Sequence, residues 1–385
     1  MSQAAQQTNA ELELFRDNIR RFIETEIQPH YEGWEEAEAS PREVWTQLGE
    51  AGLLCVDMPE EYGSAGAEFP MSAAVLEELS RAGMASLATN LSVHSDICAP
   101  YILHLGSDEQ KQRWLPKMVT GEAVAAIAMT EPGAGSDLQG MRSQAKRDGD
   151  EWVLNGSKIF ITNGGNANVV IVAARSQPEG GSRGTSLFLV DTSLPGFKVG
   201  RNLKKLGQHA GDTAELFFED MRLPADAVLG RENQGFIHLI EELPRERLAL
   251  AVGAVAAAEG VLELTKEYVL ERKAFGQSIA SFQNTRFKLA EMATDIKVNR
   301  AFIDQCVREF QAGALDVPTA AMAKLTSTEM QCRVADGCLQ LFGGYGYMRE
   351  YPIARAFADA RVQRIYGGTS EIMKEIIARS IVGKG

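Results

Sequence analysis

The sequence predicts a mainly α-helical protein with a central β-domain, whose strands form a small antiparallel barrel or sandwich. Three observations predict this fold. Residues 1–122 carry helical periodicity, residues 123–231 carry short β-type runs between turn residues, and residues 232–385 are helical again. Strands that follow one another without intervening helices favour an antiparallel arrangement over a parallel Rossmann sheet. We therefore expect three domains, at 1–122, 123–231 and 232–385.

The first block begins with apolar residues at three- and four-residue steps, which mark one face of a helix: Leu12, Phe15, Ile19, Phe22 or Ile23, and Ile27. We expect Pro29 to end this helix. Ser40 is followed by Pro41 and, three residues on, by Glu43, a pattern that predicts a capping box and a new helix. Further helical patterns cover Met71–Arg81 and Ser107–Met118.

The middle block contains five β-type runs, at Trp152–Leu154, Lys158–Ile161, Val169–Ala173, Ser186–Val190 and Ala214–Phe218. Asn155-Gly156 separates the first two, and this dipeptide predicts a tight hairpin between them. The polar stretch Ser176–Thr185 is rich in Gly and Ser, so we expect a surface loop there.

The last block contains a segment, Leu243–Leu270, that is apolar on nearly every face, as in a buried helix. We expect this helix to begin at Pro244. Three more helices are predicted around Gln283–Ala312, Pro318–Phe342 and Ser370–Ile381.

Composition narrows the class of protein. The 385 residues are 45% hydrophobic and 24% charged, and the net charge is −13, which argues against a sequence-independent nucleic-acid binder. Five cysteines without CxxC spacing predict neither disulfides nor a structural zinc site, and we expect no metal site. No uninterrupted apolar run predicts a membrane span. The N-terminus resembles no signal or transit peptide, so we expect a cytoplasmic protein, or a mitochondrial matrix protein if a eukaryotic chain has been processed.

Five segments combine glycine with aromatic and polar residues in patterns that suit a flat or phosphorylated ligand. They are Ala128–Asp137 (AMTEPGAGSD), Lys158–Gly165 (KIFITNGG), Arg272–Gln277 (RKAFGQ), Gln340–Tyr347 (QLFGGYGY) and Ile365–Glu371 (IYGGTSE). Glycine turns allow close backbone approach, an aromatic ring can cover a flat cofactor, and a basic pair can bind pyrophosphate. Taken singly, each is also explained by ordinary structure, such as a linking turn, a strand end or a helix C-terminus.

Taken together and in this order, the five segments resemble the acyl-CoA dehydrogenase family of flavoproteins across essentially the whole chain. The greatest similarity is to the long-chain branch of this family, through the segments ELPRERL, GYMREYPIARAFADARVQ and IYGGTSEIMKEIIAR. The isovaleryl-CoA branch shares with it the glycine that corresponds to Gly367. The resemblance implies a C-terminal four-helix bundle, a homotetramer, FAD as cofactor and an acyl-CoA substrate of fatty acid β-oxidation. It also implies that an electron-transfer flavoprotein accepts the electrons.

The resemblance further implies which residues bind the ligands. The FAD-binding residues are Met129, Thr130, Gly135, Ser136, Phe160, Thr162, Arg272, Phe275, Gln283, Gln340, Gly344, Thr369 and Glu371. Of these, Arg272, Phe275, Gln283, Gln340 and Gly344 are expected to serve the FAD of a neighbouring subunit. The substrate-binding residues are Ser136, Arg247, Tyr366 and Gly367.

In this family a carboxylate removes the proton next to the thioester, and flavin takes a hydride from the following carbon. Many members carry that carboxylate as Glu directly after the Tyr of the C-terminal segment, but here Gly367 follows Tyr366. The long-chain and isovaleryl-CoA branches share this glycine and place the base on a helix, which corresponds to Glu246 here. By resemblance, the Gly367 N–H donates to the thioester oxygen and stabilises the enolate.

The residues around Glu246 support its assignment as the base. Ala249, Leu250, Gly253 and Ala257 share its helix face, and a carboxylate beside such an apolar stripe is costly to bury without a purpose. Burial would raise its pKa toward the working range. The alternatives are a structural ion pair with Arg245, Arg247 or a neighbouring helix. Glu242 and Glu371 are the other candidate bases.

Three functions remain open at this point. The first is an acyl-CoA dehydrogenase. The second is an acyl-CoA oxidase or a flavin-dependent oxygenase on the same fold. The third, supported only by Gly367, is a non-catalytic scaffold or a nucleic-acid-binding relative, against which the acidic balance argues.

Overall fold

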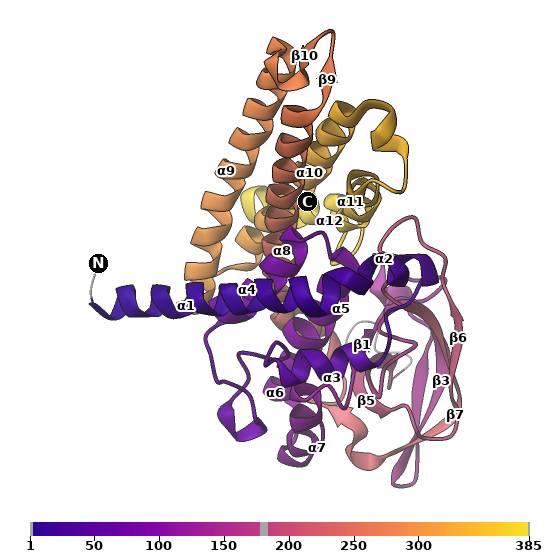
Figure 1. Ribbon diagram of the computed structural model, residues 1–385. Helices are drawn as coiled ribbons and strands as arrows, with labels where there is room; N and C mark the ends of the chain where they lie inside the picture. Colours follow the sequence, from indigo (N-terminus) through magenta and orange to yellow (C-terminus); the bar gives the residue numbers. More distant parts are fainter. Residues whose placement is uncertain (1–2, 178–183, 384–385) are drawn as a thin grey trace.

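The N-terminal part of the chain folds into helices (Figure 1). Their apolar residues pack together in the core, as the sequence periodicity predicts. The computed structural model describes residues 3–177 and 184–383. The helices of this part are α1 (Gln3–Phe22), α2 (Gln28–Ala37), α3 (Glu43–Glu50), α4 (Phe69–Arg81), α5 (Ala85–Ser92), α6 (Ala99–Leu105) and α7 (Asp108–Val119). Two π-helical segments, Ile23–Ile27 and Val93–Cys98, join α1 to α2 and α5 to α6.

Two predicted helix boundaries in this part are wrong. Pro29 does not end the first helix, because it falls in the first turn of α2, where its missing N–H is not needed. Ser40 does not cap α3, because Pro41 and Arg42 form a turn and the helix starts only at Glu43. The Arg42 side chain instead donates to the carbonyls of Gly121 and Glu122.

The middle of the chain forms an eight-stranded sheet in the order β6-β7-β3-β2-β4-β5-β8, with β1 beside β4. The strands are β1 (Ala125–Ala128), β2 (Gln144–Asp148), β3 (Glu151–Thr162), β4 (Val169–Arg175), β5 (Thr185–Asp191), β6 (Phe197–Asn202), β7 (Thr213–Pro224) and β8 (Val228–Leu229). All five predicted β-type runs lie within these strands. Most pairings are antiparallel, but β1 and β2 run parallel to β4. Most of the predicted loop 176–185 lies outside the described residues.

The hairpin predicted at Asn155-Gly156 is wrong, because both flanking runs belong to the single strand β3. The register between β3 and β7 shifts between Leu154 and Gly156, so the dipeptide forms an irregularity within the sheet. Gly156 has φ +153°, and a Cβ there would overlap Ser143. The two-residue turn lies instead at Gly149-Asp150, between β2 and β3.

The C-terminal part is a helical bundle of α8 (Gly235–Glu271), α9 (Gln283–Gln311), α10 (Val317–Phe342), α11 (Pro352–Ala360) and α12 (Ser370–Val382). A short hairpin of β9 (Lys273–Ala274) and β10 (Gln277–Ser278) follows α8, at the opposite end of the molecule from the large sheet (Figure 1). The helices predicted around 283–312, 318–342 and 370–381 are confirmed. The predicted start at Pro244 is wrong, because this proline lies inside α8, which begins at Gly235.

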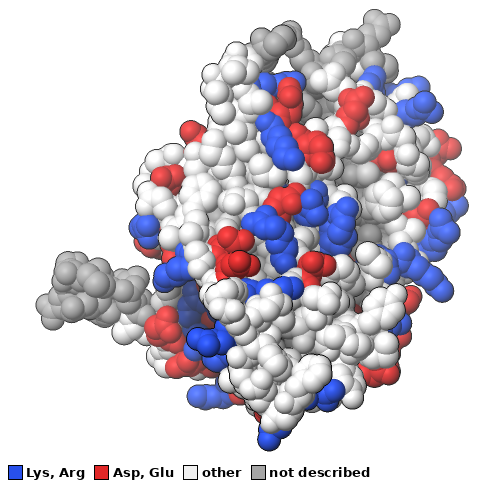
Figure 2. All heavy atoms as spheres, turned by 90° about the horizontal axis from the view of Figure 1, so that it is seen from above, with Lys and Arg blue, Asp and Glu red and all other residues white. Residues whose placement is uncertain are grey.

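Helix α8 forms the centre of the protein, packed against α4, α9 and α10. Among the described residues it is the helix that is long and apolar enough to cross a membrane, but 56% of its most apolar window is buried inside the protein, as in a core helix. All five cysteines are free. Figure 2 shows basic and acidic side chains interspersed on the face seen from above.

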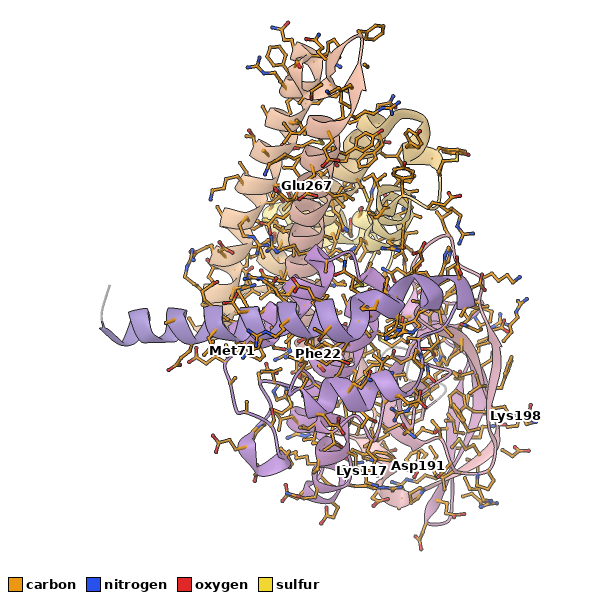
Figure 3. The ribbon with its side chains drawn as sticks, viewed as in Figure 1. Phe22, Met71, Lys117, Asp191, Lys198 and Glu267 are labelled. Atoms are coloured by element: carbon orange, nitrogen blue, oxygen red, sulfur yellow. The ribbon has the colours of Figure 1, made fainter. Side chains whose placement is uncertain are left out.

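Three apolar clusters make up the core. One joins α1, α4, α8, α9 and α10, and Phe22 and Met71 pack against its edge (Figure 3). A second fills the space between α6, α7 and one face of the sheet, and a third lies on the other face of the sheet. At the edge of the second cluster, Arg113 of α7 pairs with Asp191 of β5. The sheet therefore packs on the N-terminal helices, which in turn pack on α8.

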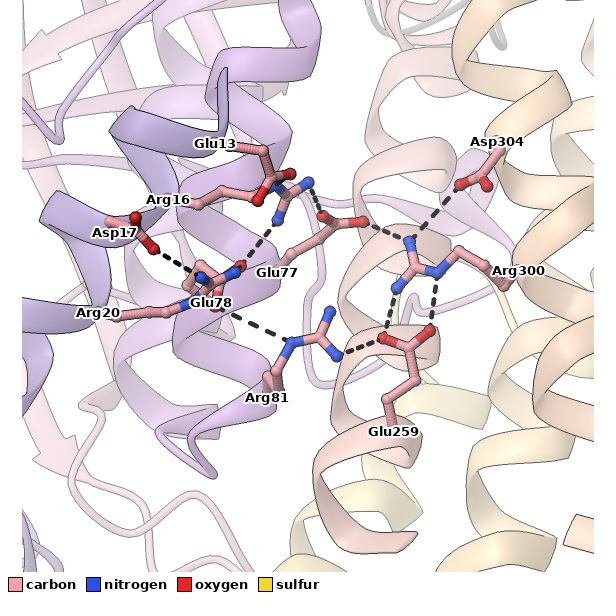
Figure 4. A network of polar contacts seen from close by, with 10 residues as sticks. All are labelled: Glu13, Arg16, Asp17, Arg20, Glu77, Glu78, Arg81, Glu259, Arg300 and Asp304. Atoms are coloured by element: carbon pink, nitrogen blue, oxygen red, sulfur yellow. Dashed lines mark hydrogen bonds and ion pairs between the residues drawn. The ribbon is translucent and has the colours of Figure 1, made fainter. Parts of the chain in front are cut away.

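A charged network ties α1, α4, α8 and α9 together (Figure 4). Arg300 of α9 pairs with Glu259 of α8 at 2.8 Å and also with Glu77 of α4. Glu78 accepts hydrogen bonds from Arg16 and Arg20 of α1. Burial acts to raise the pKa of Glu259 and of Glu78, but the arginines outweigh it and the net pKa of each is lowered. The network therefore adds stability at pH values above the ordinary glutamate pKa. This stability is lost as the pH falls from that value through the lowered pKa values of Glu259 and Glu78.

Replacing Arg300 with Met leaves Glu77 and Glu259 without a shared cation, so we expect the free energy of unfolding to fall by about 3 kcal/mol at pH 7. The difference from the wild type should narrow as the pH falls below the ordinary glutamate pKa of 4.5, because the pH then approaches the lowered pKa of Glu259 and its carboxylate takes up a proton. Urea unfolding at several pH values measures it. Arg379→Met, which breaks an exposed pair with Glu375, should change the stability by less than about 1 kcal/mol. Equal losses in both variants would contradict the network's role.

Candidate active site

Glu246 is a buried acid in the second quarter of α8. Glu246 is 5% exposed, and Tyr101 of α6 donates a hydrogen bond to its Oε1 at 2.9 Å. Burial raises the pKa of Glu246 to about 7, although the Tyr101 hydrogen bond and the Arg247 charge act in the opposite direction. A carboxyl group with this pKa can both accept and release a proton near neutral pH.

The neighbouring arginines do not pair with Glu246. Arg245 lies 2.8 Å from the carboxylate of Asp57 and donates to the Asp96 carbonyl at 2.9 Å. Arg247 is 3% exposed, and its Nε and Nη1 have no hydrogen-bond partner within the described residues. No ion pair to Glu246 occurs among those residues, so the structural ion pair considered from the sequence is wrong. Arg247 is instead a buried cation with donors free for a ligand.

The loop at Gly367 lies directly beside α8. Gly367 has φ +62°, and a Cβ there would overlap the side chain of Leu250, one helical turn after Glu246. Lys324 of α10 is fully buried and donates to the Gly368 carbonyl at 2.7 Å. The loop is therefore held against α8 and α10, within one turn of the buried carboxyl group.

A small cavity of about 30 Å³ lies along the same face of α8. Ala249, Leu250, Gly253 and Ala257 form its α8 wall, as their shared helix face predicts. Tyr366, Thr89 and Ser92 line other sides, and the Tyr366 hydroxyl lies 3.5 Å from that of Thr89. Gln331, Asp359 and Gln363 make its far wall polar.

The structure brings the first two glycine and aromatic segments together. Ile159 N–H donates to the Thr130 carbonyl at 3.0 Å, and Lys158 Nζ donates to the Met129 carbonyl at 3.0 Å. Phe160 is 64% exposed and has φ +62°, a strained conformation for an aromatic residue. The strand thus presents an aromatic ring to solvent beside the Met129–Thr130 backbone, as a flat ligand requires.

A buried ion pair that sequence reasoning missed supports this arrangement. Lys158 Nζ lies 2.9 Å from Glu131 Oε1 with both side chains buried. Burial lowers the pKa of Lys158 to about 8, against the opposing effect of Glu131. Both residues belong to segments already singled out, but only the tertiary fold reveals that they pair.

The third and fourth segments meet at the other end of the bundle. Arg272, Gln340 and Gly344 line one cleft, and the Arg272 guanidinium lies 5.3 Å from the centre of the Tyr345 ring. Phe275 lies at the tip of the β9–β10 hairpin, is 95% exposed and has φ +51°. An exposed aromatic ring in a strained turn is expected where a further molecule covers it.

The other predicted FAD-binding residues are exposed or lie at the end of a strand or helix. Gly135, Ser136 and Gln283 are exposed, and Thr162 ends β3. The Thr369 hydroxyl accepts from the Ile372 N–H and caps α12, and Glu371 is exposed in the first turn of that helix. Glu242, a candidate base, lies 2.7 Å from His104 Nδ1.

Comparisons with known proteins decide the family. Models of the N-terminal, middle and C-terminal domains of acyl-CoA dehydrogenase match residues 9–122, 126–221 and 233–382. The chain belongs to the acyl-CoA dehydrogenase family. It is 51% identical to the mitochondrial long-chain specific acyl-CoA dehydrogenase of Sus scrofa over 376 residues, which cover 97% of this chain and 87% of that protein.

Solved structures of acyl-CoA dehydrogenases are also similar to this chain over nearly its whole length. An acyl-CoA dehydrogenase from Geobacillus kaustophilus has a TM-score of 0.94 at 49% identity, covering 97% of this chain and 98% of that one. A glutaryl-CoA dehydrogenase from Mycobacterium smegmatis in complex with FADH2 has a TM-score of 0.92 at 32% identity, covering 97% and 95%. As a member of this family, the chain is an oxidoreductase that uses FAD.

The residues present fit FAD. The exposed Phe160 ring beside the Met129–Thr130 backbone suits a flat ring system, and the cleft with Arg272 suits a phosphate-bearing end. Arg272 directly follows the last residue of α8, 26 residues after Glu246, and so lies about 39 Å away at the helical rise per residue.

The positive φ of Gly367 predicts the effect of adding a side chain there. Gly367→Ala should lower the free energy of unfolding by about 1–2 kcal/mol, because an L-residue is strained in this conformation. Gly33→Ala, inside α2 with open space around it, should raise stability by about 0.5–1 kcal/mol. Urea unfolding of both variants measures this. A Gly367→Ala protein as stable as the wild type would mean that the loop does not need glycine.

Proposed function

We propose that the chain oxidises a long-chain or branched acyl-CoA to the trans-2-enoyl-CoA, with Glu246 as the base that removes the α-proton. The observation that carries this proposal is a buried carboxyl group of raised pKa, without an ion-pair partner among the described residues, on the α8 face that lines the cavity. Glu246 lies one turn from Leu250. A side chain at position 367, where many members carry their glutamate, would meet Leu250.

The proton transfer needs stabilisation of the developing enolate, because a carbon acid is weak. We assign this role to the backbone N–H of Gly367, in a loop that the Lys324 ammonium holds through the Gly368 carbonyl. Arg247 contributes unpaired donors in the same region of α8. When bound, FAD accepts the hydride from the β-carbon.

The small residues along α8 support a long or branched acyl group. They line the cavity from Ala249 to Ala257, about 12 Å along the helix, and Glu246 lies just before this stretch. Gly253 and Ala257 leave this wall without large side chains, and Gly367 adds none from the loop. Tyr366 and Ser136 complete the proposed substrate-binding residues.

We place the FAD of one subunit across two chains. Met129, Thr130, Gly135, Ser136, Phe160 and Thr162, with Thr369 and Glu371, serve the subunit's own flavin. Arg272, Phe275, Gln283, Gln340 and Gly344 serve the partner's FAD. The separation of about 39 Å between Arg272 and Glu246 supports this division, because it exceeds the reach of one dinucleotide. We infer a homotetramer with domains at 1–122, 123–231 and 232–385.

We further propose an electron-transfer flavoprotein as the acceptor, in the bacterial cytoplasm or the mitochondrial matrix. An oxidase would reduce oxygen in every turnover, whereas this chain should stall under air without an added acceptor. Rapid oxygen consumption by the purified protein with substrate would favour the oxidase instead.

Replacing Glu246 with Gln removes the base but keeps the size of the side chain. Anaerobic mixing with saturated long-chain acyl-CoA should bleach the flavin of the wild type, and the variant should bind the substrate but bleach about 10²–10⁴-fold more slowly. Stopped-flow absorbance measures the rate. Glu242→Gln, one turn away and paired with His104, is the matched control and should bleach within a few-fold of the wild-type rate. An active Glu246→Gln protein with a silent Glu242→Gln protein would move the base to Glu242.

Mixed subunits test the shared FAD site. Arg272→Ala and Glu246→Gln should each be inactive alone. When the two variants are co-expressed and assemble at random, about a quarter of the active sites should combine an intact Glu246 with an intact Arg272 from the partner subunit. The mixed assemblies should therefore recover about a quarter of the wild-type activity. Light scattering should report a tetramer. Recovery of no activity in assemblies shown to be mixed would place Arg272 at its own subunit's FAD.

A further inference from the structure

Helices α6 and α8 contact each other through two polar pairs. Tyr101 Oη donates to Glu246 Oε1 at 2.9 Å, and one turn further along, His104 Nδ1 lies 2.7 Å from Glu242 Oε1. The two pairs differ in their surroundings. Tyr101 is fully buried, whereas the His104 side chain is half exposed. A buried tyrosine hydroxyl needs an acceptor, and here the acceptor is the proposed base.

The hydrogen bond engages only one of the two carboxylate oxygens. Within residues 3–177 and 184–383, the side-chain hydrogen bond found for the Glu246 carboxylate is the one from Tyr101, and it reaches Oε1. A free glutamate side chain on a helix samples several rotamers, so a single bond from a fixed ring limits the directions in which the second oxygen can point. The tyrosine ring is itself immobilised by burial in the cluster between α6, α7 and the sheet.

We propose that Tyr101 is a positioning residue that binds Glu246 through Oε1 and leaves Oε2 to receive the α-proton of the substrate. The proposal rests on Glu246 being the base. The step itself is the one described above: the α C–H bond breaks, an O–H bond forms on Glu246 Oε2, and the hydride leaves from the β-carbon to FAD. Tyr101 keeps its own proton throughout.

The charges around Glu246 show why a neutral donor is useful there. Burial raises its pKa, and the neighbouring Glu242 carboxylate acts in the same direction, whereas Tyr101 and Arg247 lower it. Cys98, one turn before Tyr101, is also buried beside Glu246, and burial keeps its thiol protonated. Burial likewise raises the pKa of Tyr101 well above its usual value. Tyr101 therefore remains a hydrogen-bond donor over the whole working range of pH.

Tyr101→Phe removes one oxygen atom and tests the proposal on the FAD-loaded protein. Losing a hydrogen bond to the charged form raises the pKa of the base, so the pH profile of anaerobic flavin bleaching by a saturated long-chain acyl-CoA should move up by about one to two units. At pH 7 the rate should fall about tenfold, and it should recover as the pH approaches 9. The affinity for the acyl-CoA should stay within twofold.

Two further variants make the outcome decisive. His104→Gln disturbs the same helix contact without touching Glu246, so its pH profile should match that of the wild type. 3-Fluorotyrosine placed at position 101 is a more acidic phenol and a stronger donor, so it should move the profile to lower pH. It also serves if Tyr101→Phe fails to fold, which thermal unfolding and FAD content report.

An unshifted profile in Tyr101→Phe, or an equal shift in His104→Gln, would overturn the positioning role. A different result would contradict the proposed function: the flavin of Glu246→Gln would bleach at the wild-type rate. If only the positioning role is wrong, Glu246→Gln stays inactive and the pH profile of Tyr101→Phe matches that of the wild type.

Discussion

The burial of an acid on α8 is the constraint on which the rest of the structure depends. A carboxyl group placed in an apolar interior is costly to ionise, and the usual remedy is a paired cation. Here Arg245, one of the two arginines that flank Glu246 in the chain, is held by Asp57 and Asp96 on other segments. Glu246 therefore keeps a raised pKa, which the Tyr101 hydroxyl and the Arg247 charge lower only in part. Burial without pairing makes the group suitable for proton transfer rather than for stability.

This arrangement requires α8 to stay in place although its centre is built from small residues. Alanine and glycine bury little apolar area each, so the cavity wall itself contributes little cohesion. The charged network of Arg16, Arg20, Glu77, Glu78, Arg81, Glu259 and Arg300 lies beyond this wall and connects α8 to three other helices. The charged network therefore holds α8 to its neighbours where the small residues of the cavity wall contribute little.

The loop at Gly367 shows how one residue affects both packing and chemistry. Leu250 occupies the space that a side chain at position 367 would need, and the backbone there has a positive φ. A glycine consequently permits the close approach of the loop to α8, and Lys324 holds the loop through a hydrogen bond to the Gly368 carbonyl. A side chain at position 367 would therefore displace Leu250, which lies one turn after Glu246.

Much of this protein follows from local sequence. The helix-strand-helix order, the ranges of α9, α10 and α12, and the shared face of Glu246, Ala249, Gly253 and Ala257 could all be predicted, because periodicity reports which face of an element is buried. The signals that failed were local ones that context overrides. Pro29 and Pro244 lie inside helical stretches, and Asn155-Gly156 forms an irregularity within one strand, because neighbouring elements supply the packing that propensity alone lacks.

The site divides in the same way. The sequence by itself determined the candidate residues and the absence of a side chain at position 367. Only the tertiary structure decided which of them meet: Lys158 with Glu131, Lys324 with the Gly368 carbonyl, and Tyr101 with Glu246. Tyr101 and Glu246 are 145 residues apart, and neither α6 nor α8 alone carries a signal for the other. Such a contact depends on how two helices pack, which is set by the whole core and not by either local sequence.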